Sequence, residues 1–588
     1  MKEFFKYVLA TIVGIMLTGL FTLVLFFFLI AIVASTSTSS GTVQKHSVLK
    51  ISLDGIIAER AVENPFAEIL GNDELQQQGL SDLVKAIKEA EKNERIDGIY
   101  IEGGALETDY ATAQELRRAL TNFKKSKKFV IAYGEQYTQL AYYIATAADS
   151  VLLNPVGMVD LHGVSSQPMF YKDLLDKIGV KMQVFRVGTY KSAVEPYIAT
   201  EMSEANREQV TSFCTDIWQN IVNDLAQKRK ITAARINELA DSYVFLSDPK
   251  ELVKNKLIDR LAYIDEVRAT LRKLTGQEKV RVATPADLVN KEAELLKAAD
   301  DHIAVYYCEG EIVDMSTSGG FNAVSEIVGK NVIKDLDDLA QNDNVKAVVL
   351  RINSPGGSAY ASEQMWRAVQ KLKEKKPVVV SMGGLAASGG YYLACGADYI
   401  VAEPTTLTGS IGIFGLVPDV SGLLTEKLGL HFDVVKTNEA GDFGSLSRGF
   451  NEAESGAMQA YVERGYALFL SRVANGRKKP TAMVDSIAQG RVWTGNQALK
   501  IGLVDKMGTL EDAVAEAKRR AKLSDVVTVD YPAQASWMDQ FINTTKDRYI
   551  ENHLRAQLGE YYRPLRFAYS IQGRDKLQAR IPFEPNLK

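Results

Sequence analysis

The chain has 588 residues, of which 46% are hydrophobic and 24% charged, and these proportions are typical of a globular protein with more than one domain. Its net charge of −4 is too close to neutrality to indicate a nucleic-acid partner. Three cysteines far apart in the sequence suggest neither a disulfide framework nor a metal site, and we expect no metal and no cofactor.

The N-terminal segment has the pattern of a membrane anchor. After Lys6 no charged residue appears until Lys45, and residues 7–34 are almost continuously apolar. About 20 such residues span a bilayer, whereas the apolar part of a cleavable signal peptide is shorter. We therefore predict an uncleaved transmembrane helix, although the small residues at 33–35 leave cleavage open. Lys2 and Lys6 favour a cytoplasmic N-terminus, which places the rest of the chain outside the cytoplasm.

The body of the chain contains an internal repeat. Ala141-Tyr-Tyr-Ile-Ala145 recurs 249 positions later as Gly390-Tyr-Tyr-Leu-Ala394, and several Asp, Pro and Gly residues coincide at the same offset. Such self-similarity indicates a duplicated structural unit. The predicted domains are a cytoplasmic N-terminus with the anchor (residues 1–34), a flexible tether rich in Ser and Thr (35–45) and a first α/β repeat (46–300). They are followed by a second α/β repeat (301–521) and a partly helical tail without a repeat partner (522–588).

The apolar patterns alternate between strand and helix within the repeats. Short β-branched runs predict buried strands, and apolar residues at helical spacing predict helices. This alternation favours a parallel sheet with right-handed crossovers, and therefore an α/β fold. Strands are expected at 182–187, 345–352, 377–381 and 399–402, and helices at 362–373, 386–397, 455–473 and 510–521.

Glycine and serine concentrate at two places in the second repeat, at residues 353–358 and 381–390. Glycines after a strand let backbone N–H groups face a reacting atom, as oxyanion stabilisation requires. A serine at the start of a helix, flanked by Ala and Gly, suits a nucleophile, so Ser388 is the candidate, with Gly389 and Gly356 or Gly357 as the oxyanion hole. A plain helix cap and a plain turn remain open as alternatives.

The first repeat lacks these serine and glycine residues at the corresponding positions. At the offset of 249, Ser388 corresponds to Gln139, and Ser410 corresponds to Leu161. A purely structural cap or turn has less reason to differ between two copies of one scaffold. The difference therefore favours a functional role for the second copy.

A serine nucleophile needs a general base. No histidine lies near Ser388 in the sequence, which leaves a folded-in Ser-His-Asp site possible and makes lysine the other established base. A lysine base must be neutral, so burial or neighbouring charges must lower its pKa. Lys191, in Gly188-Thr-Tyr-Lys-Ser, follows a predicted strand and has Ala440 as its counterpart in the second repeat, but the chemistry alone does not select it among the lysines.

Several segments together resemble the signal peptide peptidase A family, also called protease IV, in its long duplicated form. The resemblance covers nearly the whole chain and includes the anchor, both repeats and the order of the motifs. The family is similar in its α/β core to Clp-type proteases and the crotonase fold, so the expected fold is two tandem repeats of that kind behind a transmembrane helix. The matching segments are Val184–Pro196, Asn353–Gly357, Ala386–Tyr392, Leu407–Ile413 and Gly490–Gly495.

The resemblance implies a role for each site residue. Ser388 matches the nucleophile of the family, Lys191 its general base, and Ser410 a serine whose hydroxyl orients the lysine amine. Gly356 and Gly357 match the oxyanion-hole segment. The implied activity is that of a serine protease with a Ser-Lys dyad.

The resemblance also implies a setting and partners. It indicates a single-pass protein of the cell inner membrane with its catalytic part on the periplasmic side, which degrades cleaved signal peptides and other unfolded apolar peptides. It further implies contact with the lipid bilayer through the N-terminal helix, a homotetramer and no nucleic-acid partner. Two alternatives remain, a crotonase-like acyl-CoA enzyme on the same core and an inactive membrane scaffold.

Overall fold

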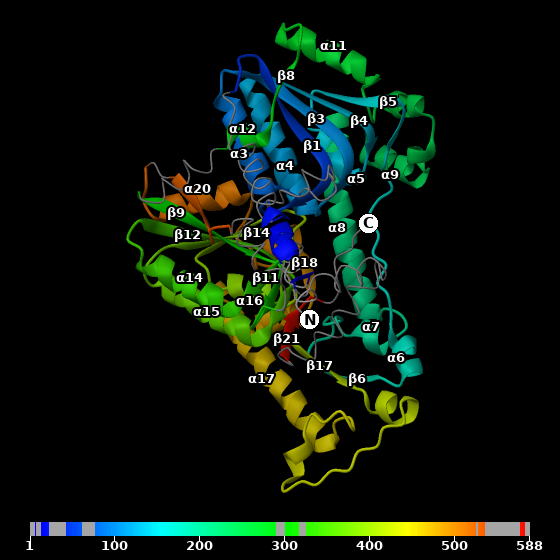
Figure 1. The fold of residues 1–588 in the computed structure, drawn as a ribbon, viewed down its shortest axis with the longest axis vertical. Helices are drawn as coiled ribbons and strands as arrows, with labels where there is room; N and C mark the ends of the chain where they lie inside the picture. The colour runs from blue at the N-terminus through cyan, green and yellow to red at the C-terminus, as the bar shows by residue number, and fades with distance from the viewer. Residues whose placement is uncertain are drawn as a thin grey trace.

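Within the residues that it describes, the computed structural model contains two α/β units and three sheets (Figure 1). The two units follow one another in the chain and correspond to the two predicted repeats. The third sheet contains strands from both of them. The structure describes residues 6–7, 13–22, 43–61, 77–289, 300–316, 325–524, 527–534 and 577–581.

The sheet of the first repeat is parallel, with the order β2-β1-β3-β4-β5-β7 and with β8 beside β1. Parallel strands buried on both faces have nearly continuous apolar sequences, as in Val130-Ile-Ala132. The strands are β1 Ser47–Ala58, β2 Gln77–Gly79, β3 Ile96–Glu107, β4 Phe129–Tyr137, β5 Ser150–Val159, β7 Arg260–Leu261 and β8 Arg281–Ala283.

Helices cover both faces of this sheet. Apolar residues of α3, α4, α5 and α8 form the core on one face, and those of α11 pack on the other. The helices are α3 Leu80–Lys92, α4 Tyr110–Phe123, α5 Gln139–Ala145, α6 Lys172–Ile178, α7 Glu195–Ile198, α8 Glu204–Arg229, α9 Ala233–Asp241, α10 Pro249–Lys254, α11 Ile264–Thr275 and α12 Pro285–Leu288, with short 3-10 turns η2 Lys124–Ser126 and η3 Val244–Leu246.

The sheet of the second repeat has the order β18-β16-β14-β12-β9-β20, with β15 joining β14 to β19. Its central strands are parallel, and β18 at the edge is antiparallel to β16. The strands are β9 His302–Glu309, β12 Val345–Ser354, β14 Val378–Ala387, β15 Tyr399–Ala402, β16 Leu407–Gly409, β18 Val492–Thr494, β19 Lys506–Met507 and β20 Val527–Tyr531.

The helices of the second repeat reproduce the arrangement of the first. Helices α14 to α17 build the core on one face of the sheet, and α20 packs on the other as α11 does in the first repeat. The long helices α8 and α17 both contain 26 residues. The helices are α14 Gly329–Gln341, α15 Ala359–Lys373, α16 Gly389–Ala394, α17 Glu452–Arg477, α18 Thr481–Ile487, α19 Gly495–Lys500 and α20 Leu510–Arg520, with short turns η4 Leu423–Lys427 and η5 Glu439–Asp442.

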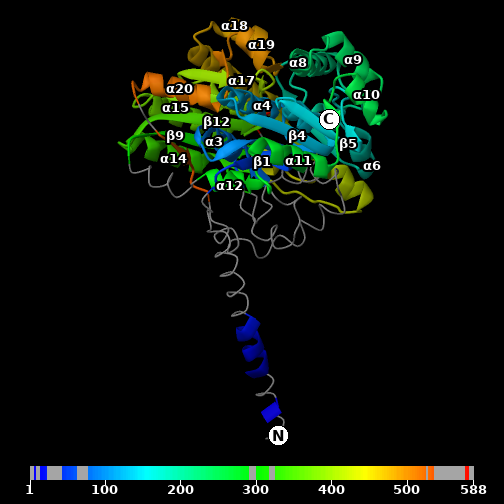
Figure 2. The same ribbon diagram turned by 90° about the horizontal axis from the view of Figure 1, so that it is seen from above.

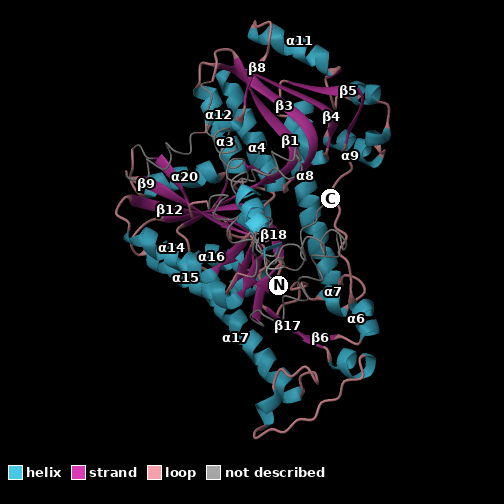
Figure 3. Cartoon of the chain, viewed as in Figure 1, coloured by secondary structure: helices cyan, strands magenta, loops and turns pink. Residues whose placement is uncertain are grey.

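The third sheet joins the repeats at the lower right of Figure 3, where β6 and β17 lie side by side. Its order is β11-β10-β13-β21-β17-β6, and β6 is the strand that comes from the first repeat. The strands are β6 Lys181–Arg186, β10 Glu311–Val313, β11 Glu326–Val328, β13 Gly356–Ser358, β17 Phe414–Asp419 and β21 Leu577–Arg580.

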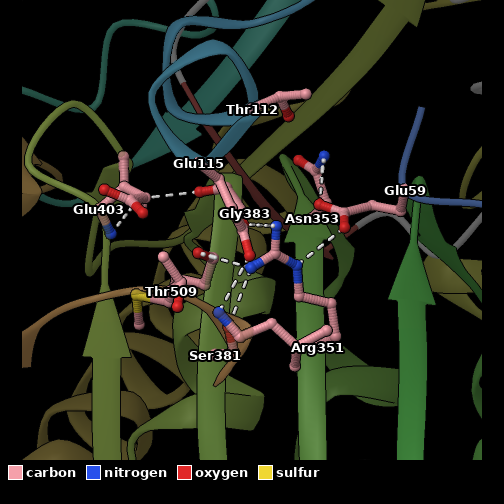
Figure 4. Close-up of polar contacts among 12 residues, drawn as sticks. Glu59, Thr112, Glu115, Arg351, Asn353, Ser381, Gly383, Glu403 and Thr509 are labelled. Carbon is pink, nitrogen blue, oxygen red and sulfur yellow. Dashed lines mark hydrogen bonds and ion pairs between the residues drawn. The ribbon is translucent and has the colours of Figure 1, made fainter. Parts of the chain in front are cut away.

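A buried ionic cluster holds the repeats together where α4 contacts β14. Figure 4 shows the guanidinium of Arg351, on β12, between two carboxylates of the first repeat. Its Nε lies 2.8 Å from Glu59 Oε2, and its Nη2 lies 2.8 Å from Glu115 Oε2. The amide of Asn353 also donates to Glu59, at 3.2 Å. The first repeat therefore contacts the strand that leads into the Pro-Gly-Gly segment.

Most predicted elements are confirmed, but the helix expected at 386–397 is wrong at its start. Strand β14 continues to Ala387, and α16 spans only Gly389–Ala394. The reason is tertiary: Leu385 to Ala387 pair with β16, which holds them extended although Leu and Ala favour helices.

The two ends of the chain are described only in part. Residues 13–22 are helical and stand apart from the body in Figure 2, but much of the predicted anchor lies outside the described residues. No helix within the described ranges is long and apolar enough to cross a membrane. In the tail, the described residues include β20 and β21, and β20 joins β9 as β8 joins β1 in the first repeat. Most of the tail predicted to be partly helical, residues 522–588, lies outside the described residues.

Candidate active site

Strand β6 positions Lys191 beside the second repeat. It pairs antiparallel with β17 of the second repeat, and its last residue, Arg186, lies opposite Phe414. The loop that follows is fastened by a hydrogen bond from the backbone N–H of Tyr190 to the carbonyl of Gln489, at 2.9 Å. Gly188 has a φ of +102°, and a Cβ there would lie 2.5 Å from the backbone of Gln489. Only glycine permits so close a passage.

Ser388 occupies the junction between β14 and α16. Its φ of +53° is rare for a residue with a side chain, and such strain costs about 1–3 kcal/mol. Its backbone N–H donates to the carbonyl of Gly409 at 2.8 Å, which fixes the junction against β16. Its side chain makes no capping hydrogen bond to α16. The hydroxyl is therefore directed elsewhere, contrary to the plain-cap alternative.

Three side chains meet at this junction. Lys191 Nζ lies 2.8 Å from Ser388 Oγ and 3.0 Å from Ser410 Oγ, and it donates to the carbonyl of Ser410 at 3.1 Å. All three residues have an exposed fraction of 0%. The structure thus brings together Lys191, Ser388 and Ser410, which the sequence places far apart.

Burial disfavours the charged form of Lys191. Removal from water holds the pKa of Lys191 well below its usual value of 10.5, since burial penalises the ammonium form. A neutral amine has two N–H donors and one lone pair. In that form the two donors of Lys191 would match the carbonyl and hydroxyl of Ser410, which would leave the lone pair for the hydroxyl of Ser388.

Two glycines leave room for the side chain of Lys191. A Cβ on Gly490 would lie 2.6 Å from Lys191 Cβ, and a Cβ on Gly412 would lie 3.2 Å from Lys191 Cδ. Gly490 also has a φ of +79°. These residues lie in the Gly490–Gly495 and Leu407–Ile413 motifs. Close packing against Lys191 therefore explains why glycine is needed at one position of each motif.

Gln209, on α8, is a residue that the sequence did not indicate. It is fully buried, and its Nε2 donates to the carbonyl of Tyr190 at 3.0 Å. Its Oε1 accepts from the backbone N–H of Val492 at 3.1 Å. One side chain therefore ties the lysine loop to the strand beside β16. A glutamine on a helix carries no sequence signal of such a bridge.

The predicted oxyanion residues lie beside Ser388. A Cβ on Gly356 would lie 2.7 Å from the backbone nitrogen of Gly389, so the absence of a side chain keeps that N–H open. The N–H of Gly356 itself donates to Ser354 Oγ at 3.1 Å. Gly357, on β13, packs so closely on Ile312 that a Cβ would lie 2.0 Å from its carbonyl oxygen.

The corresponding place in the first repeat is filled by a structural amide. Gln139 Oε1 accepts from the backbone N–H groups of His162 and Gly163, both at 3.0 Å. Its Nε2 donates to the carbonyl of Gly163 at 2.8 Å. Gln139 thus holds by hydrogen bonds the loop that, in the second repeat, carries Ser410.

A buried amine in contact with a serine hydroxyl, beside backbone amides that glycines leave open, is an arrangement for acyl transfer, and it defines the class as a serine hydrolase. Peptidase family S49 matches residues 122–278 and 370–524, so each repeat carries a copy, and the Clp protease family matches residues 321–406.

Three known proteases are similar in sequence to half of the chain or more, or to nearly half of it. Protease 4 of Salmonella typhi is 36% identical over 529 residues, 87% of this chain and 84% of that protein. The chloroplastic serine protease SPPA of Arabidopsis thaliana is 31% identical, over 82% of this chain and 70% of that protein. The putative signal peptide peptidase SppA of Enterococcus faecium is 33% identical, over 49% of this chain and 86% of that protein. The chain therefore belongs to peptidase family S49 and is a serine protease, which decides against an acyl-CoA enzyme.

Proposed function

We propose that this protease hydrolyses peptide bonds with Ser388 as nucleophile and Lys191 as general base. The observation that carries the proposal is the 2.8 Å contact between Lys191 Nζ and Ser388 Oγ, made by an amine with no exposure to water. A lysine acts as a base only when neutral, and burial lowers its pKa in that direction. The strained φ of Ser388 aims its hydroxyl at the amine rather than at its own helix.

The reaction follows from the hydrogen bonds. Ser410 accepts the two N–H bonds of the neutral amine and so directs the lone pair of Lys191 to the hydroxyl of Ser388. Lys191 takes that proton as the serine oxygen attacks the peptide carbonyl carbon. The ammonium then protonates the leaving amine, and the acyl group remains on Ser388. Water, deprotonated by the same lysine, releases the product acid.

Backbone amides stabilise the oxyanion. Gly389 and Gly357 are the proposed donors, because the N–H of Gly356 is already engaged with Ser354. Gly356 contributes by leaving the space in front of Gly389 free of side-chain atoms. Donors fixed in this way cost no reorganisation when the charge develops.

Removal of the nucleophile tests the proposal. Ser388→Ala is expected to lower β-casein hydrolysis by ~10⁴-fold or more while the far-ultraviolet circular dichroism stays unchanged. Ser486→Ala is the matched control, because Ser486 is exposed on α18 and bonds only locally in the described structure. Ser410→Ala should lower activity less, by disturbing the lysine. Activity of Ser388→Ala equal to that of the control would refute the assignment and favour the inactive scaffold or another nucleophile.

The cellular setting is part of the proposal. Residues 7–34 would anchor the protease in the cell inner membrane with the repeats on the periplasmic side, as their apolar run and flanking lysines predict. The substrates would be apolar peptides, including signal peptides left after cleavage of preproteins, in line with the name of the Enterococcus relative. A synthetic signal peptide should be cut at least about tenfold faster than a polar peptide of equal length, and equal rates would contradict this preference.

An exposed apolar segment supports a homotetramer. Residues 428–435 expose Leu428, Leu430, Phe432, Val434 and Val435, the last by 98%. They correspond to residues 178–185 at an offset of 250, where Ile178-Gly-Val180 matches Leu428-Gly-Leu430. In the first repeat this segment includes most of β6, which pairs with β17 of the second repeat. We infer that residues 428–435 make the equivalent contact with the next subunit, in a head-to-tail ring.

A further inference from the structure

The side chain of Arg491 has no role in the reaction as described so far, although it connects the two repeats beside the site. Its guanidinium carbon lies over two aromatic rings, 4.7 Å from the centre of the Tyr190 ring and 4.5 Å from that of Trp493. Its Nη1 lies 2.9 Å from Glu208 Oε1, on α8. Tyr190 and Glu208 belong to the first repeat, and the other two residues belong to the second. Arg491 therefore contacts, across the repeat boundary, the residue that precedes Lys191.

The backbone around Arg491 holds both serines of the site. The carbonyl of Arg491 accepts the N–H of Ser410 at 2.7 Å. Trp493, on β18, packs so closely on Gly409 that a Cβ there would lie 2.9 Å from Cδ1 of the indole. The carbonyl of Gly409 in turn accepts the N–H of Ser388. The segment that fixes the two serines thus also carries the cation that contacts the lysine loop.

The position of the guanidinium is set by the rings rather than by a full set of hydrogen bonds. Arg491 Nε is buried and has no hydrogen-bond partner among the residues that the structure describes. A buried donor without a partner destabilises a fold, so its presence in a native structure needs an explanation. The flat guanidinium of arginine stacks on aromatic faces, whereas the compact, strongly hydrated ammonium of lysine does so less well. Contact with Tyr190 and Trp493 supplies that explanation.

The first repeat has no equivalent of this cation. Helices α18 and α19 end 246 positions after α9 and α10, which makes Phe245 the counterpart of Arg491. Phe245 packs edge-on against the rings of His162 and Tyr243 in its own repeat. The arginine therefore occurs only in the repeat that carries the two serines, as expected of a residue that serves the site.

We propose that Arg491 is a positioning residue for the reaction, which holds Tyr190 on the second repeat and so keeps the amine of Lys191 aligned with the nucleophile and shielded from water. This inference rests on the proposed function of Ser388 and Lys191. Loss of the contact loosens the loop after β6, so the amine faces the serine hydroxyl less often. Water then also reaches the amine and stabilises its ammonium form.

The variant Arg491→Lys tests this role, because it keeps a positive charge near Glu208 but loses the flat group. With β-casein as substrate, we expect kcat to fall by about 10-fold or more with KM nearly unchanged, since a misplaced base slows the chemical step. The acid limb of the plot of kcat against pH should move to higher pH by about half a unit or more, because a hydrated Lys191 binds a proton more readily. A residue that only stabilised the fold would leave that limb in place.

Two further comparisons make the test specific. Arg464→Lys is the matched control, because Arg464 lies over the ring of Tyr461 on the exposed side of α17, and it should keep the wild-type kcat and pH profile. Tyr190→Leu should behave like Arg491→Lys. Tyr190→Phe keeps the ring but loses the hydrogen bond to Glu208, and it should restore most of the rate that Tyr190→Leu loses.

Ser388→Ala in the same assay separates this inference from the proposed function. An inactive Ser388→Ala together with an Arg491→Lys variant of wild-type kcat and pH profile would overturn the role of Arg491 and leave the proposed function standing. A lower melting temperature with unchanged kcat, or equal rates for Tyr190→Phe and Tyr190→Leu, would also overturn that role. A fully active Ser388→Ala would overturn both.

Discussion

The amine of Lys191 is fully buried, and its hydrogen-bond partners in the described structure all belong to the second repeat. At neutral pH the unfolded chain binds a proton on this lysine more readily than the folded chain does, because burial lowers the folded pKa. Stability therefore rises with pH through this group, and its burial destabilises the fold most strongly at acidic pH. The burial of the proposed base therefore lowers the local stability of the fold.

Replacement of this lysine separates activity from stability. Lys191→Met is expected to lower peptide hydrolysis by at least ~10³-fold, the range of a general base. It should also raise the melting temperature, by roughly 2–4 °C for each kcal/mol of relieved cost, and more at acidic than at alkaline pH. Calorimetry and a hydrolysis assay measure both effects. Lys228→Met is the matched control, because burial lowers the pKa of Lys228 to about 8 at a place outside the site, and it should stay active.

The site residues differed in how far the sequence could indicate them. Ser388 stood out because the repeats differ there, and Gln139 in the first repeat has a structural role that explains the difference. Lys191 did not stand out from its chemistry, because its defining property is burial, which depends on the pairing of β6 with β17. Family resemblance selected it instead.

At the scale of elements, the loop of Lys191 depends on two long-range attachments. Strand β6 holds its start on β17, and Gln209 of α8 holds its end on Val492. Among the described strands of the third sheet, β6 was predicted, as the strand at 182–187, but β13 was not. Strand β13 is short and contains two glycines, and its extension comes from partners distant in the sequence rather than from propensity.

Substitution of Gln209 tests the attachment. Gln209→Leu keeps the volume but loses the hydrogen bonds to Tyr190 and Val492, so the amine should lose its alignment with Ser388. We expect kcat to fall by about 10–100-fold with KM nearly unchanged, since Gly356, Gly357 and Gly389 beside Ser388 are untouched. Gln219→Leu, on the exposed face of the same helix, is the control. A fall in melting temperature with unchanged kcat would make Gln209 a purely structural residue.

At the scale of the whole molecule, the proposed active site lies where the two repeats meet. The first repeat supplies Lys191 and Gln209, and the second supplies Ser388 and Ser410. The buried pairs of Arg351 with Glu59 and Glu115 lock this arrangement, and loss of one partner of such a pair typically costs 3–5 kcal/mol. The sequence showed the duplication but not this lock, since isolated Arg and Glu residues normally lie on the surface.

The proposed ring predicts a specific loss of assembly. Val435→Asp places a charge on a side chain that is 98% exposed in the single chain and buried in the inferred contact. We expect sedimentation to show a shift from the tetramer towards monomers, with little change in the melting of the isolated chain. Val282→Asp, another exposed valine, is the control. An unchanged oligomer for Val435→Asp would exclude residues 428–435 from the interface.

The central claim is that Ser388 and Lys191 act as one unit across the two repeats. A double-mutant cycle on peptide hydrolysis tests it most directly, with Ser388→Ala, Lys191→Ala and the double variant compared at mildly alkaline pH. Residues that act as a unit lose nearly the full rate with the first substitution. We predict that each single variant loses at least ~10³-fold and that the double variant is no slower than the slower single variant. Near-wild-type hydrolysis by Lys191→Ala, or losses that multiply in the double variant, would contradict the account.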